Sequence, residues 1–187
     1  MKTKLKEVAS IQTGVFGKTT AIGEIVYLQS KHFDENGHLL SKLHPDLKLD
    51  NTTQKHLLQP GDVLFAAKGT KNFASVYEKH NPLSVASTSF FVIRLFEGKI
   101  IPEYLAWIIN HPTTQKILKG KAIGTSIVSI SKSVLEDLEF SIPDLQTQQT
   151  ILKISSLRKQ EINIQKHMEK LKEQYIQQLL LNAINHD

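Results

Sequence analysis

The last quarter of the chain, from Pro143 to the C-terminus, most constrains what this sequence can fold into. Beyond Pro143 there is no further proline and no glycine, so nothing interrupts a helix over about forty residues. Apolar side chains recur along it in a heptad pattern, while the other faces carry lysine, arginine, glutamate and glutamine. The a and d positions of this pattern hold Ile154, Leu157, Ile164, Met168, Leu171 and Tyr175.

A narrow apolar stripe on a charged helix favours a partner helix, because water does not satisfy such a stripe. We therefore expect these six side chains to form a dimer interface. Three polar residues in the same register, Glu161, Gln178 and Asn182, would fix the alignment of the paired helices. A helix of this length would span roughly 60 Å. The alternative is a long amphipathic helix that folds back on its own domain.

The length and composition of the chain limit its domain size and the classes of protein to which it can belong. The 187 residues suit one domain of ordinary size with an appendage. The chain has no cysteine, which excludes disulfides and thiolate metal sites. The first residues lack the apolar core of a signal peptide, and no apolar run approaches the length of a membrane span. We therefore expect a cytoplasmic protein without a membrane partner.

The charge balance favours a polyanion as partner. Lysine and arginine number 23 against 18 aspartates and glutamates, a moderate surplus that suits phosphate neutralisation. Most of the surplus precedes Pro143, because the charges of the final segment nearly cancel. If nucleic acid is bound, the front domain binds it.

Strands and helices alternate irregularly before Pro143, which predicts an α+β or mixed α/β head. The first expected element is a short helix from Thr3 to Gly14 with Leu5, Val8 and Ile11 on one face. A strand is expected over residues 24–30.

The middle of the chain continues with a surface segment and further strands. Residues 41–58 are expected to be irregular and exposed. A hairpin follows, with a strand over 63–67, a polar loop over 68–72 and a returning strand. Residues 85–96 form the most strand-like run of the chain, with one exposed stretch at residues 87–89.

Two helices should then open at Pro102 and Pro112, the second ending at Gly120. A Gly-Thr-Ser turn at 124–126 follows. Ser133 and Glu136 are spaced as a capping box for one helical turn, and a last strand should reach Ile142.

Polar loops supply the candidate contacts with nucleic acid. Residues 14–20 contain two glycines and a lysine but lack the earlier glycine of a phosphate loop, because position 12 is Gln. The 68–72 loop combines lysines with short polar side chains, a mixture suited to phosphates and base edges. A solvated hairpin tip would have the same composition. The 124–126 segment would grip phosphate or form a plain turn.

Catalytic and metal-binding motifs are absent from the sequence. The eight histidines form no HExxH pattern. No G-x-S-x-G elbow exists, and without cysteine a thiol nucleophile is impossible. We expect no catalytic residue and no metal site in this chain.

Five segments in order give the chain a recognisable pattern. They are KLKEVASIQTG, LQPGDVLFAAKGT, STSFFVIRL with IIPEYLAWIINHP, KAIGTSIVSISKSVLEDLEFSIPDLQTQQTIL, and the heptad segment ending LKEQYIQQLLLNAI. The junction IP-x-L-x-x-Q-x-x-I after a Gly-Ser/Thr turn is the most diagnostic. On these segments the chain resembles the DNA specificity subunit of type I restriction-modification systems.

The resemblance implies a non-catalytic subunit that reads double-stranded DNA and directs adenine methylation and restriction to a two-part site. Residues 1–143 would be a target recognition domain, and residues 144–187 a coiled-coil helix for dimerisation and methyltransferase docking. Methyltransferase and restriction subunits would be the partners. They, not this chain, would use S-adenosylmethionine and ATP. The expected DNA contacts lie on four loops: Lys18, Thr19, Thr20, Gln29, Lys31, His32, Lys68, Thr70, Lys71, Asn72, Thr125, Ser126 and Ser129.

The chain departs from this family in one respect: a full specificity subunit has two head-and-helix units in tandem, whereas this chain has one. It is therefore either a half-length subunit that forms a homodimer or a truncated or recombination-partner copy. The family suggests antiparallel pairing of the helices, and the heptads do not decide it. Two readings from other classes remain: a coiled-coil adaptor whose head binds protein, and an enzyme of unrecognised type.

Overall fold

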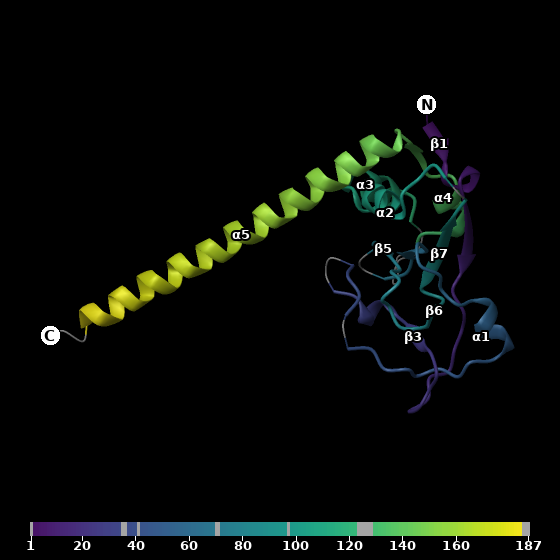
Figure 1. The fold of residues 1–187 in the computed structure, drawn as a ribbon, viewed down its shortest axis with the longest axis horizontal. Coiled ribbons are helices and arrows are strands. Elements are labelled where there is room, and N and C mark those ends of the chain that lie inside the picture. Colours follow the sequence, from purple (N-terminus) through teal and green to yellow (C-terminus); the bar gives the residue numbers. More distant parts are fainter. Residues whose placement is uncertain are drawn as a thin grey trace. The chain divides into compact units, whose positions relative to one another are not determined.

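The computed structural model describes residues 2–34, 37–40, 42–69, 72–96, 98–122 and 129–184. The chain divides into two compact units, Met1–Gln148 and Gln149–Asp187. The first unit is a mixed α/β head of short strands and helices (Figure 1). The predicted fold class, a mixed head followed by one long helix, is confirmed.

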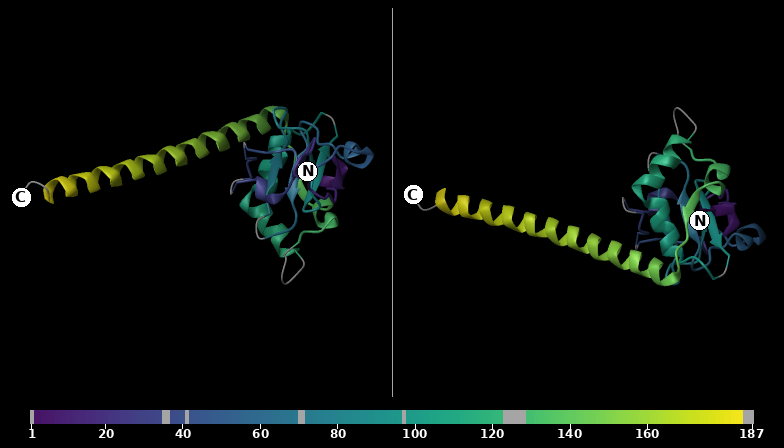
Figure 2. Two further views of the ribbon diagram at one scale, coloured as in Figure 1. Left: turned by 90° about the horizontal axis from the view of Figure 1, so that it is seen from below. Right: turned by 90° about the horizontal axis from the view of Figure 1, so that it is seen from above.

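The long helix α5 (Leu145–Ile184) is 40 residues long and unbroken, and both views in Figure 2 show it as one continuous helix. Asp144 caps its first turn, because its carboxylate accepts hydrogen bonds from the backbone N–H and the hydroxyl of Thr147 at 2.9 and 2.7 Å. The six predicted a and d side chains are between 50% and 66% exposed. None of the helices in the described part of the chain is long and apolar enough to cross a membrane.

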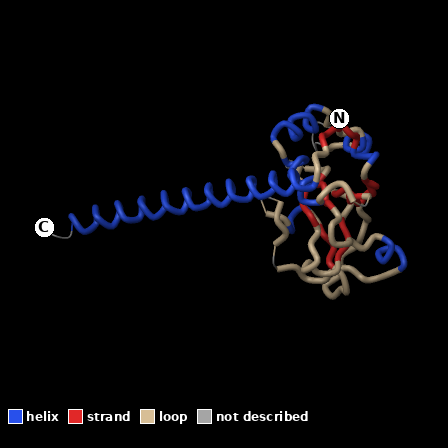
Figure 3. The backbone as a smooth tube through the Cα atoms, turned by 45° about the horizontal axis from the view of Figure 1, so that its top comes forward, coloured by secondary structure: helices blue, strands red, loops and turns tan. Residues whose placement is uncertain are grey.

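A four-stranded antiparallel sheet forms the centre of the first unit, where Figure 3 draws its strands in red. Neighbouring strands follow the order β2, β7, β4 and β5. Ile93 of β7 lies opposite Ile11 on one side and Val63 on the other. The strands are β2 (Ala9–Thr13), β7 (Phe90–Leu95), β4 (Val63–Ala66) and β5 (Ala74–Val76).

One face of this sheet is covered by helices. Helix α2 (Pro102–Asn110) packs against β5 and β4, and α4 (Lys132–Glu136) packs against β2. Helix α3 (Pro112–Gly120) packs against α2. Both α2 and α3 begin with the prolines predicted to open them, where the missing N–H of proline costs no helical hydrogen bond.

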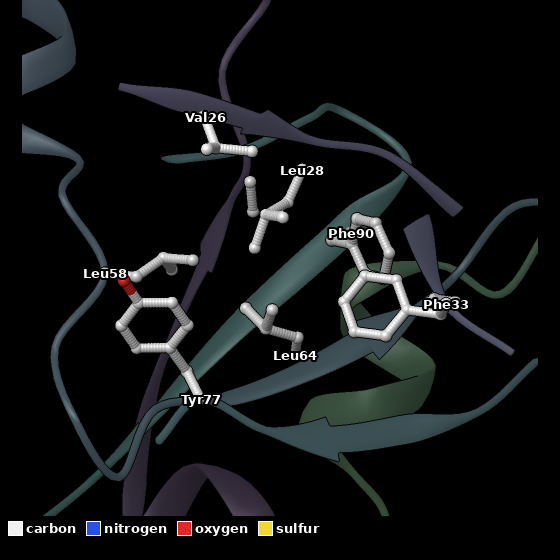
Figure 4. Packing of buried hydrophobic residues seen from close by; sticks show 9 residues of the cluster. Val26, Leu28, Phe33, Leu58, Leu64, Tyr77 and Phe90 are labelled. Atoms are coloured by element: carbon white, nitrogen blue, oxygen red, sulfur yellow. The ribbon is translucent and has the colours of Figure 1, made fainter. Parts of the chain in front are cut away.

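The other face carries the larger described core (Figure 4). Leu64 and Phe90 of the sheet pack there against Val26 and Leu28. Two parallel strands, β3 (Val26–Leu28) and β6 (Ser84–Ala86), form the second layer. Burying these side chains contributes roughly 2 kcal/mol each to folding.

The first fourteen residues do not form the predicted helix. They form β1 (Lys2–Lys4), a 3-10 turn at Leu5–Glu7 and β2. β1 pairs with β8 (Glu139–Ser141), the predicted last strand. Leu5 and Ile11 are buried, as a helix would also require, but Ile11 is buried as part of a strand paired with β7.

Three further predictions need correction. The 85–96 run is two strands, β6 and β7, separated at residues 87–89, and Ser87 is buried. Helix α4 is capped by Ser131, whose hydroxyl accepts from the Val134 N–H at 3.3 Å, so the predicted box starting at Ser133 is wrong. Within 41–58 a short helix α1 (Asn51–Lys55) forms, and Leu47 and Leu58 on either side of it are buried rather than exposed.

Candidate nucleic-acid interface

The predicted contact loop at residues 18–20 is exposed and held by its backbone. The N–H of Thr20 donates to the carbonyl of Asp46 at 2.7 Å, and its hydroxyl donates to the carbonyl of Ile22 at 2.7 Å. Lys18 and Thr19 are exposed beside it. The loop thus presents a cation and a hydroxyl on a fixed backbone, the groups that contact phosphates and base edges.

The predicted contacts at residues 29–32 form a short turn at the end of β3. Gln29 precedes a 3-10 turn at Ser30–His32, and its N–H donates to Nδ1 of His32 at 3.2 Å. Burial lowers the pKa of His32, the neighbouring Lys31 lowers it further, and Asp46 opposes both. His32 is therefore a neutral hydrogen-bonding residue near neutral pH, whereas Lys31 is an exposed cation.

The structure brings the predicted loops at 68–72 and 125–129 together. Lys68 and Ser129 form an antiparallel bridge, and the N–H of Ile130 donates to the carbonyl of Ala67 at 2.9 Å. The amide of Asn72 donates to the carbonyl of Ala66 at 2.9 Å, so this side chain helps to shape its own loop. Four predicted contacts lie outside the described residues: Thr70, Lys71, Thr125 and Ser126.

A turn at residues 87–89 joins these segments. The Ser87 N–H donates to the carbonyl of Leu28, the residue before Gln29, at 2.9 Å. The carbonyl of Ser89 accepts from the N–H of Ala67, the residue before Lys68, also at 2.9 Å. The two hydroxyls lie 2.7 Å apart. The loop from residue 14 reaches the same turn, because Val15 forms a parallel bridge with Ser87.

This serine turn was not among the predicted contacts. Its signal in the sequence is the polar run Ser87, Thr88, Ser89 inside an otherwise apolar segment. Gly14 is required beside it, because a Cβ at that position would lie 2.1 Å from the carbonyl oxygen of Ser87. A larger residue would push the 14–20 loop away from the other three segments.

A pocket on the neighbouring surface adds basic groups that sequence reasoning missed. Lys55, His56 and Arg94 line it together with Gly14 and Ala86, the residue before the serine turn. Basic side chains from two separate chain segments, Lys55–His56 and Arg94, therefore adjoin the start of the 14–20 loop and the residue before the serine turn. Among the described residues no cluster of metal-ligating side chains accompanies them.

The arrangement is one of short polar side chains and lysines on braced loops, which suits binding to a polyanion. Comparison with protein families supplies the context. Residues 1–174 match the model of the type I restriction modification DNA specificity domain. This chain belongs to that family. No curated protein matches it at a significant level.

Solved structures of such subunits share the fold. The S subunit of the type I restriction-modification system of M. genitalium is 15% identical, with a TM-score of 0.59, and the match covers 84% of this chain. The HsdS subunit of Thermoanaerobacter tengcongensis is 15% identical, with a TM-score of 0.60 over 87% of this chain. A chain from a structure on complex assembly and conformational transition of the type I R-M system is 16% identical, with a TM-score of 0.69 over 96% of this chain.

This chain corresponds to only part of those proteins. The matches cover 38%, 38% and 43% of the three solved chains, respectively. At these identities the likeness concerns the fold. A single head and helix is thus equivalent to roughly two fifths of a solved subunit.

Proposed function

We propose that this chain is a sequence-reading subunit of a type I restriction-modification complex. Its head would bind one half of a two-part site in double-stranded DNA, and the complex would methylate adenine there and restrict unmodified DNA. The family match over residues 1–174 is the observation that carries this proposal. The family consists of non-catalytic recognition subunits that carry no cofactor, S-adenosylmethionine being used by the methyltransferase subunits.

The head, residues 1–143, is proposed to read the DNA through the loops joined at Ser87 and Ser89. The cations Lys18, Lys31 and Lys68 would neutralise phosphates, whereas Gln29 and the short hydroxyl side chains would contact base edges. Support for this assignment comes from the backbone bonds that join three of the loops to the serine turn and the fourth, through Ser129 and Ile130, to Lys68 and Ala67. Because those bonds fix the loops relative to one another, their polar groups are preorganised for one ligand.

The helix, residues 144–187, is proposed to pair with the same helix of a second copy and to offer its other faces to methyltransferase subunits. The exposed heptad stripe supports pairing. The length comparison supports a second copy, because one chain matches about two fifths of a solved subunit. A twofold dimer would read a symmetric, interrupted sequence. ATP would be used by the restriction subunit, and the complex would act in the cytoplasm.

Methylome sequencing tests this function. The chain is expressed with its cognate methyltransferase in a host that lacks other adenine methylation. Modified adenines should appear at one two-part sequence and disappear when the gene for this chain is deleted. Methylation that is absent, or that does not depend on this chain, would contradict a role in DNA specificity and favour an adaptor.

A further inference from the structure

Phe16 lies almost fully in solvent, although its backbone is firmly held. Its side chain is 87% exposed, the highest value among the large apolar residues described. It belongs to the loop between β2 and β3, at the end of the first unit opposite α2 and α3 (Figure 1). In the same loop Ile22 is 86% exposed, and Lys18 lies between the two. The loop therefore exposes two large apolar side chains, with an exposed lysine between them in sequence.

A buried tyrosine fixes the backbone on both sides of Phe16. The hydroxyl of Tyr27 donates to the carbonyl of Val15 at 2.9 Å and accepts from the N–H of Gly17 at 3.2 Å. Val15 is itself bridged to Ser87. Gly17 lies close to the core, since a Cβ there would be 3.0 Å from the side chain of Leu47. These contacts fix the three residues so that the ring of Phe16 points away from the core.

Folding does not explain this placement, because a ring that is 87% exposed contributes little apolar burial. Single exposed apolar residues are common on protein surfaces. Phe16 differs from those because a buried hydroxyl fixes its backbone, and because Val15 joins it to the turn that collects the candidate DNA contacts. An exposed aromatic side chain on a fixed backbone, close in sequence to an exposed lysine, suits stacking on bases or opening a base step.

Resting on the proposed function, we infer that Phe16 contacts the base pairs of the bound DNA directly, by stacking on or wedging into a base step, while Lys18 contacts the adjoining phosphate. DNA is the occupant that the charge favours, because the apolar pair flanks a lysine and the loop is bonded to the other candidate DNA contacts. The contact is apolar, so it should add affinity for the site without adding to the dependence on salt.

The inference is tested on the complex of the full chain with its methyltransferase. Fluorescence anisotropy measures binding at several salt concentrations. One duplex carries the two-part sequence identified by methylome sequencing, and the other carries the same bases in scrambled order. The variant is Phe16→Ala, and the control is Phe96→Ala. Phe96 is 55% exposed and follows the end of β7 that lies away from Phe90 and the serine turn. Duplexes with 2-aminopurine at successive positions of the site report stacking in the same complexes.

Phe16→Ala should weaken binding to the site about tenfold with an unchanged salt slope. It should also abolish a position-specific change in 2-aminopurine fluorescence that the unmodified complex produces. Phe96→Ala should leave both unchanged. The melting temperature of Phe16→Ala should equal that of the unmodified chain, since the ring is not packed.

Site binding by Phe16→Ala equal to that of the unmodified complex would overturn the inference and leave the proposed function standing. An unchanged fluorescence signal with weakened binding would overturn the direct base contact. Failure of Phe16→Ala to assemble with the methyltransferase would assign the loop to a protein partner and overturn it too. If the unmodified complex does not distinguish the two duplexes, the proposed function fails and the inference with it.

Discussion

Arg94 holds the buried carboxylate of Asp62 through two parallel hydrogen bonds. Its Nε donates to Oδ1 and its terminal nitrogen to Oδ2, both at 2.7 Å. The Asp62 side chain is 1% exposed, and it also accepts from the N–H of Gln59 at 2.8 Å. The hydrogen bond to Asp62 raises the pKa of Arg94. The pair joins β7 to the turn before β4, on the side of the sheet that faces the basic pocket.

Replacing Arg94 by Ala should destabilise the chain by about 2 kcal/mol, because Asp62 would remain buried without its charged partner. Denaturant unfolding measures this change. The matched control is Lys132→Ala, which breaks the exposed pair of Lys132 with Glu136 and should cost about 0.3 kcal/mol. Equal effects of the two substitutions would contradict a structural role for the Asp62–Arg94 pair.

Gln148 is the buried polar residue of α5, and its side chain joins the first turn of the helix to the head. Its amide donates to the carbonyls of Lys99 and Pro143 at 2.8 Å each and accepts from the N–H of Ile101 at 2.9 Å. Gln148→Leu would leave three backbone groups unpaired and should cost about 3 kcal/mol in unfolding free energy.

The neighbouring residue offers a control for that substitution. Gln149 is exposed, so Gln149→Leu should leave the unfolding free energy nearly unchanged. Protease cleavage near residue 145 should also accelerate in Gln148→Leu, because the first turn would no longer be held. A Gln148→Leu chain as stable as Gln149→Leu would show that the three hydrogen bonds contribute nothing net.

The sequence correctly predicted those helices whose signals lie in neighbouring residues. The prolines that open α2 and α3 and the uninterrupted helix after Pro143 depend only on nearby residues, and these predictions were right. The spacing of Leu5 and Ile11 suits a helix as well as two short strands, and pairing with β8 and β7, far along the chain, decided between them. A polar residue in a helix normally faces solvent, so Gln148 gave no sign of its burial.

The sequence predicted the loops of the candidate site one by one. The structure shows the backbone contacts that join them. The turn at Ser87 and Ser89 connects segments at Val15, Leu28 and Ala67, which are distant in sequence, through backbone contacts that leave no pattern in composition or spacing. The sequence also did not predict Phe16 as a contact residue. A phenylalanine in a sequence indicates burial, and only the structure reveals it in solvent.

His32 should make the head less stable in acid. Burial and Lys31 lower its pKa in the folded state below the ordinary value of 6.5. As pH falls through 6.5 the unfolded chain therefore takes up a proton that the folded chain resists, and stability decreases with falling pH. NMR titration should give His32 a pKa below the ordinary value of 6.5. A value at or above 6.5 would contradict the effect of burial.

Lys68→Ala should weaken DNA binding and flatten its dependence on salt. Lys68 is exposed where the two predicted loops meet, and removing one lysine–phosphate interaction reduces the slope of log K against log salt by about 0.9. Lys79→Ala is the matched control, because Lys79 is an exposed lysine beyond the other end of the β4–β5 hairpin. A slope that is the same in Lys68→Ala and the unmodified chain would remove this lysine from the DNA-binding surface.

The heptad stripe of α5 predicts a dimer that single charges disrupt. Leu157 and Leu171 are exposed apolar residues at d positions, so Leu157→Asp or Leu171→Asp would bury a charge between paired helices and should convert dimer to monomer. Lys166→Asp changes the charge at an f position, on the opposite side of the helix, and should leave the dimer intact. Sedimentation velocity distinguishes the two states. A monomeric unmodified chain, or a dimer unaffected by all three substitutions, would contradict pairing through this stripe.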